Sequence, residues 1–193
     1  ETPEPALVNS ISLTFYIDKG NKVRINDLNF FGNETVPDLK LKKQMKGTKE
    51  MTRITLNPAE YKSPYGINET TTFEEYMNDY GFLSFTKTKS FIDPYFRFKL
   101  FSSAKFDEKK YEEDKQSLLT YYNSLGYRDA VIVSDTQYYV GTGNMNVDIK
   151  VDEGRKYYFG DIAWRGNTKY PDSVLTAVLG IQKGDTYNVE TLN

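Results

Sequence analysis

VDEGRKYYFGDIAWRGNTKYPD, residues 151–172, repeats a stretch that the chain has used once before, IDKGNKVRINDLNFFGNETVPD at residues 17–38. Aligned without gaps at an offset of 134 residues, the two stretches agree at 8 of 22 positions. Unrelated sequences of average composition would agree at about one or two. The identical pairs are Asp18/Asp152, Gly20/Gly154, Lys22/Lys156, Asp27/Asp161, Gly32/Gly166, Asn33/Asn167, Pro37/Pro171 and Asp38/Asp172. A repeat at a fixed offset indicates successive copies of one structural unit.

Each copy of the repeat begins with the pattern of a β-strand. Apolar and polar residues alternate over residues 11–17 and again over 145–151, and this period predicts a strand with one buried face. Each strand runs into an Asp-x-Gly turn, where glycine can adopt positive φ. A second strand is expected at residues 22–31 and 156–165. A Gly-Asn turn and a helix follow in both copies.

A stronger helix and a β-hairpin lie between the two copies. In FDEKKYEEDKQSLLTYYNSLGY, Asp107 suits the N-cap, and Gly126 stands where a left-handed C-cap is expected. Residues 129–139 then have the pattern of a strand, and VGTGN forms a turn to its antiparallel partner at 145–151.

These elements predict the domain organisation of the chain. A complete strand–helix–helix–strand–strand unit occupies residues 20–153, with an insert at about 47–100. Residues 1–19 are expected to hold the last strand of a preceding unit, and residues 154–193 the first part of a following one. An incomplete sheet at each end should leave apolar strands exposed or paired with another molecule.

The stretch KFDEKKYEEDKQSLLTYYNSLGYRDAVIVSD, residues 105–135, resembles the second helix, corner and second strand of the POTRA domains of BamA-type outer-membrane β-barrel assembly factors. The Asp-Glu-Gly and Gly-Asn turns match too. The resemblance implies an α+β fold of tandem POTRA units, each with two helices on a three-stranded mixed sheet. The insert departs from the family pattern, in which a short connection joins the two helices.

The resemblance also implies a function. The chain would be the periplasmic part of a Gram-negative outer-membrane protein, whose own carboxy-terminal β-barrel lies outside this sequence. Its expected partners are unfolded outer-membrane proteins and accessory periplasmic or lipoprotein subunits. Two alternatives stay open, namely the POTRA region of a two-partner-secretion or TamA-like transporter, and a purely structural spacer.

The edge of the sheet is the main candidate binding site. In POTRA domains the first and second strands lie at the edges, where an extended peptide can add a strand by β-augmentation. Alternatively, these residues only pack under the helices. The expected docking strand is Ala130, Val131, Ile132, Val133, Ser134, Asp135 and Thr136.

The insert supplies a second candidate surface. Aromatic residues at this density usually bury something, which favours a local core over a docking surface. The residues in question are Phe73, Tyr76, Tyr80, Phe82, Tyr95 and Phe96. Asp152, Glu153 and Gly154, in the Asp-Glu-Gly turn, are expected to form the joint between successive units.

The composition excludes several classes of function. The net charge is −2, with no basic stripe of the kind that nucleic-acid-binding proteins carry. The absence of cysteine and histidine excludes disulfides, thiol nucleophiles, the usual zinc sites and Ser-His-Asp chemistry. The carboxylates at residues 107–114 spread around a helix as a solvated face. We therefore expect no catalytic residue, metal, cofactor or small-molecule substrate.

Overall fold

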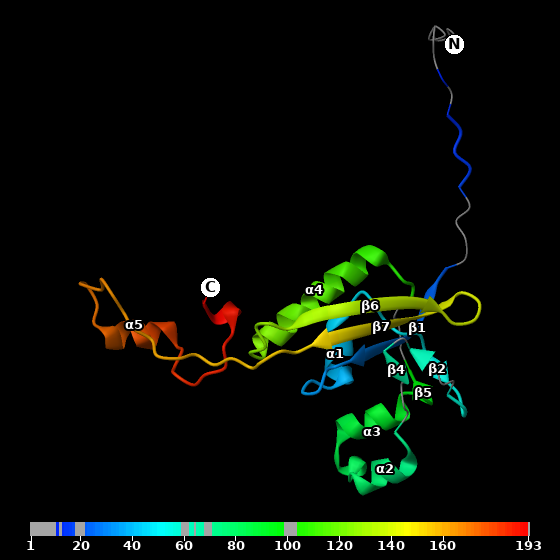
Figure 1. The fold of residues 1–193 in the computed structure, drawn as a ribbon, viewed down its shortest axis with the longest axis horizontal. Coiled ribbons are helices and arrows are strands. Elements are labelled where there is room, and N and C mark those ends of the chain that lie inside the picture. The colour runs from blue at the N-terminus through cyan, green and yellow to red at the C-terminus, as the bar shows by residue number, and fades with distance from the viewer. Residues whose placement is uncertain are drawn as a thin grey trace.

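The structure is a computed structural model, and it describes residues 11, 13–17, 22–58, 62–63, 65–67, 71–98 and 104–192. Within residues 22–153 its elements follow the predicted order, with small elements added in the insert (Figure 1). The described elements are β1 (Arg24–Phe31), α1 (Asp38–Gln44), β2 (Arg53–Ile54), β3 (Lys62–Ser63), β4 (Gly66–Ile67), α2 (Phe73–Asn78), η1 (Gly81–Leu83), α3 (Phe85–Ile92), β5 (Phe96–Arg97), α4 (Glu108–Ser124), β6 (Val131–Tyr139), β7 (Asn144–Asp152), α5 (Asp172–Leu179) and η2 (Val189–Leu192).

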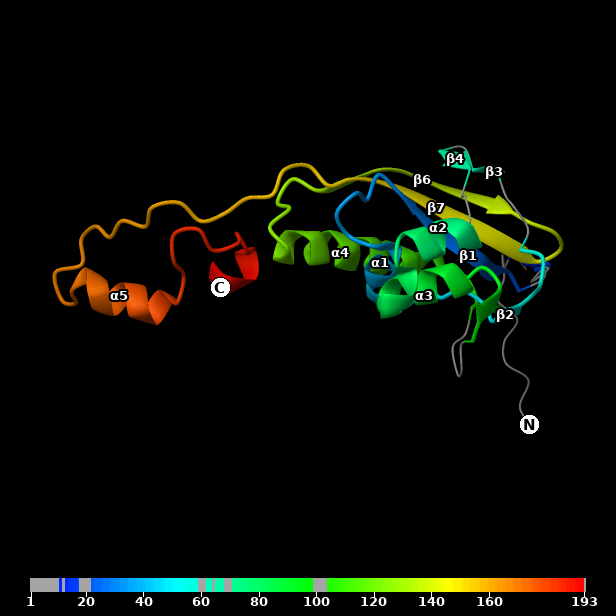
Figure 2. The ribbon, with the colours of Figure 1, turned by 90° about the horizontal axis from the view of Figure 1, so that it is seen from below.

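A three-stranded sheet with the order β1-β7-β6 forms the centre of the fold. β1 runs parallel to β7, whereas β6 pairs with β7 antiparallel through the hairpin turn. α1 and α4 pack on one face of this sheet, so the expected POTRA-type arrangement of two helices on a mixed sheet is confirmed (Figure 2).

The core lies between α4, α1 and the sheet. The Asp107 side chain accepts a hydrogen bond from the Lys110 backbone N–H and so starts α4, as predicted. Tyr111, Leu118 and Tyr122, spaced along one face of this helix, are fully buried. Burial of side chains of this size contributes about 1.5–3 kcal/mol each, which fixes the helix on the sheet.

β7 is covered on both faces. Met145, Val147, Ile149 and Val151 alternate toward the helices, whereas Asn146 and Asp148 point away from them and are nevertheless fully buried. β3 and β4 lie on this second face (Figure 2). There the Tyr65 hydroxyl lies 2.8 Å from Thr136 Oγ1, and its ring packs against Phe31. The insert therefore covers a sheet face that the helices leave open.

The repeated Gly-Asn turn adopts the same geometry twice. Gly32 and Gly166 both have φ of +79°. The amide of Asn33 donates to the Val36 carbonyl and to Asp38, and that of Asn167 donates to the Tyr170 carbonyl and to Asp172. The sequence repeat therefore encodes one local structure, which positions a helix start in each copy.

Two predicted strands are wrong. Described residues 11 and 13–17 form no ladder and lie exposed, and within 156–165 only Tyr158 forms a bridge, to Thr186. A strand needs a hydrogen-bonded neighbour, and the described residues provide none for the first segment and a single bridge for the second. Two apolar side chains of α5, Val174 and Val178, are exposed as well. These segments project from opposite ends of the sheet (Figure 1).

An unusual backbone conformation follows α2. Thr72 and Glu75 form a capping box at the start of this helix, and beyond its end Tyr80 adopts the left-handed conformation, with φ of +51°. Gly81 is needed next to it, because a Cβ there would lie 2.3 Å from the Tyr76 ring. The glycine thus permits close contact between the bend and the helix.

Candidate functional site

The outer side of β6 is an open sheet edge. Among the described residues, no element pairs with β6 on the side away from β7. Ala130 directly precedes this strand and is buried, whereas Val131 and Val133 are 50% and 54% exposed. An edge of unpaired N–H and C=O groups can accept a further strand.

The hairpin turn decides which backbone groups face this edge. The Val140 N–H donates to the Asn144 carbonyl at 2.9 Å, and the register is regular from there to Ser134. Because hydrogen-bonded pairs alternate in an antiparallel ladder, Ser134, Thr136 and Tyr138 point their backbone groups toward β7. Those of Asp135 and Gln137 point toward the open edge.

A register shift interrupts the predicted docking strand. Ile132 pairs with Val151 and Ser134 with Lys150, so Val133 between them is the extra residue of a bulge. Bulges bend a strand and raise its twist, and they break up a flat edge. The regular part of the docking edge therefore begins after Val133.

Asp135 turns its side chain inward and ties β6 to α4. Its carboxylate accepts hydrogen bonds from the Tyr111 hydroxyl at 2.8 Å and from Lys115 at 3.0 Å. Burial alone would raise the pKa of this carboxyl, but the bonds from Lys115 and Tyr111 outweigh it and lower the pKa. Burial and the bond to Asp135 raise the pKa of Tyr111. The helix thus holds β6 in place while its outer edge stays free.

The opposite edge, along β1, is closed by the insert and its flanks. The Ile25 N–H donates to the Ala104 carbonyl, and its carbonyl accepts from the Met51 N–H, both at 2.8 Å. The Leu28 N–H donates to the Glu50 carboxylate at 3.0 Å. These outward backbone groups in the first part of β1 are therefore occupied.

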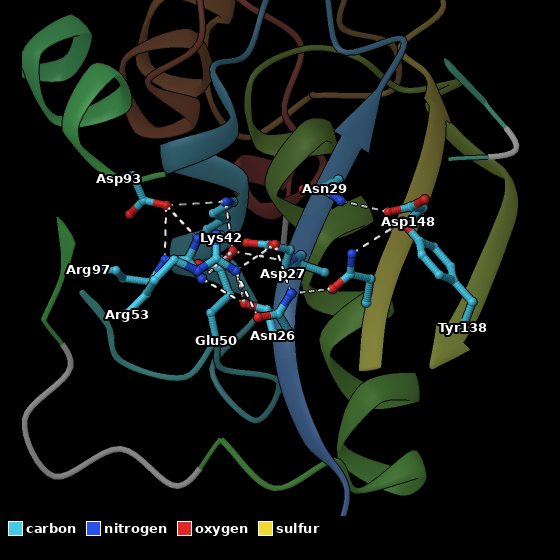
Figure 3. A network of polar contacts seen from close by, with 12 residues as sticks. Asn26, Asp27, Asn29, Lys42, Glu50, Arg53, Asp93, Arg97, Tyr138 and Asp148 are labelled. Atoms are coloured by element: carbon cyan, nitrogen blue, oxygen red, sulfur yellow. Dashed lines mark hydrogen bonds and ion pairs between the residues drawn. The ribbon is translucent and has the colours of Figure 1, made fainter. Parts of the chain in front are cut away.

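A buried network of charges fixes this closure (Figure 3). Asp27 of β1 pairs with Arg53 at 2.7 Å and with Arg97 at 2.8 Å, and Arg97 also reaches Glu50 at 3.3 Å. Burial would raise the pKa of Asp27, but Arg53 and Arg97 together lower it. Lys42 and Asp93 complete the network. Each buried charge has an opposite partner, so the insert is attached firmly to β1.

A second chain of polar contacts crosses the sheet beneath the hairpin of β3 and β4. The Asn26 amide donates to Asn146 Oδ1 at 2.8 Å, and the Asn146 amide donates to the Tyr138 hydroxyl at 3.3 Å. The Asn29 amide donates to Asp148 at 2.8 Å. These contacts join all three strands on the face away from the helices (Figure 3).

The aromatic residues proposed as an insert surface divide into two groups. Tyr76 stacks on Phe91 with ring centroids 4.5 Å apart, and Tyr95 packs against the same ring. The others are exposed, namely Phe73, Tyr80, Phe82 and Phe96. The structure therefore contains both a small aromatic core and an exposed aromatic surface in the insert.

Glu153 of the predicted joint acts within its own unit. Its carboxylate accepts hydrogen bonds from the backbone N–H groups of Thr35 and Val36 and from the Tyr122 hydroxyl, at 3.0–3.1 Å. Asp152 accepts from the Gly154 N–H and is exposed. The turn after β7 therefore anchors the start of α1 and the end of α4.

Contacts to the following segment come from the corner between α4 and β6, which sequence reasoning did not assign to the joint. The Tyr157 N–H donates to the Gly126 carbonyl at 2.9 Å, and its hydroxyl donates to Asp129. The Arg128 guanidinium lies 4.6 Å from the centre of the Tyr157 ring. The hydrogen bonds from Tyr157 and Arg128 lower the pKa of Asp129.

The described residues contain no group of three or more His, Cys, Asp or Glu side chains that could hold a metal ion. None of the helices in the described part of the chain is long and apolar enough to cross a membrane. A cleft of about 90 Å³ lies between α1 and α3 and is lined partly by Lys42, Lys43, Lys49 and Lys89.

Comparison with known proteins gives one family match. The model of the POTRA family, described as a surface antigen variable number repeat, matches residues 23–154 and 157–193. The crystal structure of POTRA3-5 of Haemophilus influenzae BamA is similar with 21% identity and a TM-score of 0.48. That match covers 91% of this chain, which spans about half (52%) of the matched chain. None of the curated proteins compared with the chain matches it.

Proposed function

Because the chain belongs to the POTRA family, we propose that it is a periplasmic region of a BamA-type outer-membrane protein assembly factor. In this role the chain docks extended segments of unfolded outer-membrane proteins, or of accessory lipoprotein subunits, along the outer edge of β6. Binding proceeds by β-augmentation, in which backbone hydrogen bonds give the affinity. The barrel to which such a region belongs is not in this sequence.

The observation that carries this proposal is the difference between the two edges of the sheet. Asp135 and Gln137 direct backbone groups to the open side of β6. On β1, the N–H and C=O groups of Ile25 and the N–H of Leu28 are already bonded, to Ala104, Met51 and Glu50. The open edge therefore supports docking at β6, and the closed edge limits docking to that side.

The character of the edge supports a partner recognised mainly through its backbone. Val131 and Val133 are exposed and apolar, and Gln137 is exposed and uncharged. Asp135, the one acidic side chain in β6, is engaged by Tyr111 and Lys115. An incoming strand thus meets main-chain groups and small apolar contacts, which suits binding that tolerates many sequences.

Proline at position 137 tests the proposal. Gln137→Pro removes an N–H that faces the open edge, whereas Gln137→Thr changes the side chain and keeps that N–H. The probe is a dye-labelled peptide with the sequence of one strand of an outer-membrane β-barrel, and its binding is followed by fluorescence anisotropy. We expect Gln137→Pro to weaken binding about tenfold, because it removes one hydrogen bond and adds a steric clash, and Gln137→Thr to bind like the unaltered chain.

Circular dichroism and urea unfolding establish that both variants are folded. Equal affinity of folded Gln137→Pro and the unaltered chain would refute docking at this edge. If the unaltered chain binds no such peptide, a role as a structural spacer is favoured instead.

A further inference from the structure

The bend between α2 and α3 carries a cluster of exposed apolar side chains. Tyr80, Phe82, Leu83 and Phe85, called the tip from here on, are 67%, 52%, 77% and 85% exposed. Four large apolar side chains within six residues, all in water, are unusual for a folded surface and mark an interaction site. These side chains lie on the helical hairpin formed by α2 and α3, which projects away from the sheet (Figure 1).

The exposure of the tip does not come from a loose bend. The Tyr76 ring stacks on Phe91 and lies so close to Gly81 that a Cβ there would be 2.3 Å away. Thr88 Oγ1 lies 2.8 Å from the Tyr76 hydroxyl and donates to the Gly81 carbonyl at 3.2 Å. Tyr80 also holds a φ of +51°, which costs a residue with a side chain about 1–2 kcal/mol. The contacts of Tyr76 and Thr88 therefore hold the strained bend in place, and the tip side chains stay exposed.

Positive charge adjoins the tip on the α3 side. Phe85, Lys89 and Ile92 are spaced four and three residues apart and so share one face of α3. Lys89 lines the cleft between α1 and α3 together with Lys43 and Lys49. These three residues, called the lysine cluster, form no ion pair with any described residue.

The acidic residues near this surface are engaged elsewhere or belong to the other helix. Glu50 and Asp93 are paired with Lys42 and Arg97, and Asp79 is paired with Lys87. Glu74 and Glu75 lie on α2, where the Glu75 carboxylate accepts from the Thr72 N–H. The α3 side of the hairpin therefore presents uncompensated positive charge beside apolar side chains.

We propose that the tip and the lysine cluster bind an anionic phospholipid surface. Phe, Tyr and Leu side chains enter the boundary between headgroups and acyl chains, while lysines beside them meet lipid phosphates. The unpaired lysines provide the charge complementarity with such a surface. This contact does not depend on peptide docking at β6, which lies on a different element.

Vesicle flotation of the 193-residue chain tests the proposal. Vesicles of phosphatidylcholine alone are compared with an equimolar mixture of phosphatidylcholine and phosphatidylglycerol, at low and high salt. The chain is expected to float with the mixed vesicles at low salt, and less at high salt, because ions screen the lysines.

Two variants separate the apolar and the charged parts of the surface. The double variant Phe82→Ser/Phe85→Ser should weaken binding about a hundredfold, about tenfold for each aromatic side chain. Lys89→Ala should weaken it about fivefold, and only with the anionic vesicles. The matched controls, Tyr139→Ser and Lys109→Ala, remove an exposed aromatic and an exposed lysine elsewhere and should bind normally.

Three results would overturn the proposal. The first is no flotation of the unaltered chain with either vesicle. The second is equal flotation of the tip variant, whose circular dichroism should match that of the unaltered chain because the substituted side chains are exposed. The third is a concentration-dependent dimer in sedimentation velocity that the tip variant abolishes while vesicles bind neither protein, which would assign the tip to a second copy of the chain.

Discussion

The Arg97 guanidinium lies 2.8 Å from the carboxylate of Asp27 and joins the last strand of the insert to the first strand of the sheet. The two residues stand 70 positions apart in the sequence, and both are buried. Through this contact a segment that departs from the family pattern is fixed against the β1 edge of the sheet. It leaves β6 as the edge at which another chain can add a strand.

Loss of Arg97 is expected to destabilise the fold strongly. Arg97→Met keeps much of the side-chain volume but leaves buried carboxylates with fewer partners, and breaking a buried ion pair costs about 3–5 kcal/mol. Urea unfolding measures the change in the free energy of unfolding. The control is Arg128→Met, whose ion pair with Asp129 is half exposed and whose loss should change the free energy of unfolding much less. Equal effects of the two substitutions would contradict the role of the network.

Acid should weaken the same network. The folded state lowers the pKa of Asp27 below its usual 3.8, so the unfolded chain binds the proton more tightly. The stabilising contribution of the Asp27 carboxylate is therefore complete at pH values above its usual pKa of 3.8, and it is lost as the pH falls through the lowered pKa of the folded state. Asp27→Asn should be less stable than the unaltered chain at pH near 7 and should lose less stability on acidification. Parallel losses in both proteins, measured by urea unfolding across this range, would argue against it.

Glu153 is expected to matter for stability far more than its neighbour in the same turn. Glu153→Gln places an amide NH₂ opposite backbone N–H groups and leaves a buried donor unsatisfied, at a cost of about 1–3 kcal/mol. Asp152→Asn, at an exposed position, should change stability by less than about 0.5 kcal/mol. Thermal unfolding followed by circular dichroism compares the two. A larger loss from Asp152→Asn would show that the turn is anchored differently.

The sequence repeat offers a matched pair of glycine substitutions. Gly32 and Gly166 share φ of +79°, but a Cβ at Gly32 would lie 2.2 Å from the Val151 carbonyl oxygen, whereas nothing lies within 4 Å at Gly166. Gly166→Ala should cost only the backbone strain of about 1–2 kcal/mol, and Gly32→Ala should cost clearly more. Far-UV circular dichroism reports on the sheet, and fluorescence of Trp164 reports on the second copy. A smaller loss from Gly32→Ala would contradict the close approach of β1 and β7.

Local signals were sufficient to predict α4 and the hairpin of β6 and β7. The N-cap at Asp107, the helical spacing of Tyr111, Leu118 and Tyr122, and the turn before Asn144 each act within a few residues. The alternation at residues 11–17 and the apolar run at 156–165 are local too. They indicate which face of a strand could be buried, but they do not show whether an adjacent strand is present to form its backbone hydrogen bonds. Those two strands were therefore predicted wrongly.

The closure of β1 could not be predicted in this way. Asp27, Glu50 and Arg97 come from three separate segments, and no period or spacing connects them. The aromatic residues of the insert present a similar difficulty. Tyr76 packs on Phe91, whereas Phe82, only six residues later, is exposed. The bend at Tyr80 and Gly81 separates the two side chains, and the aromatic content of the sequence does not reveal it.

Amide hydrogen exchange, followed by NMR while a barrel-strand peptide is added, tests docking at β6 residue by residue. We expect the amides of Asp135 and Gln137 to exchange fast in the free chain and to become protected when the peptide binds. The amides of Ile25 and Leu28, already bonded to Ala104 and Glu50, should be protected throughout and should not change. Protection gained along β1, or none gained at Asp135 and Gln137 in the presence of bound peptide, would contradict docking at the β6 edge.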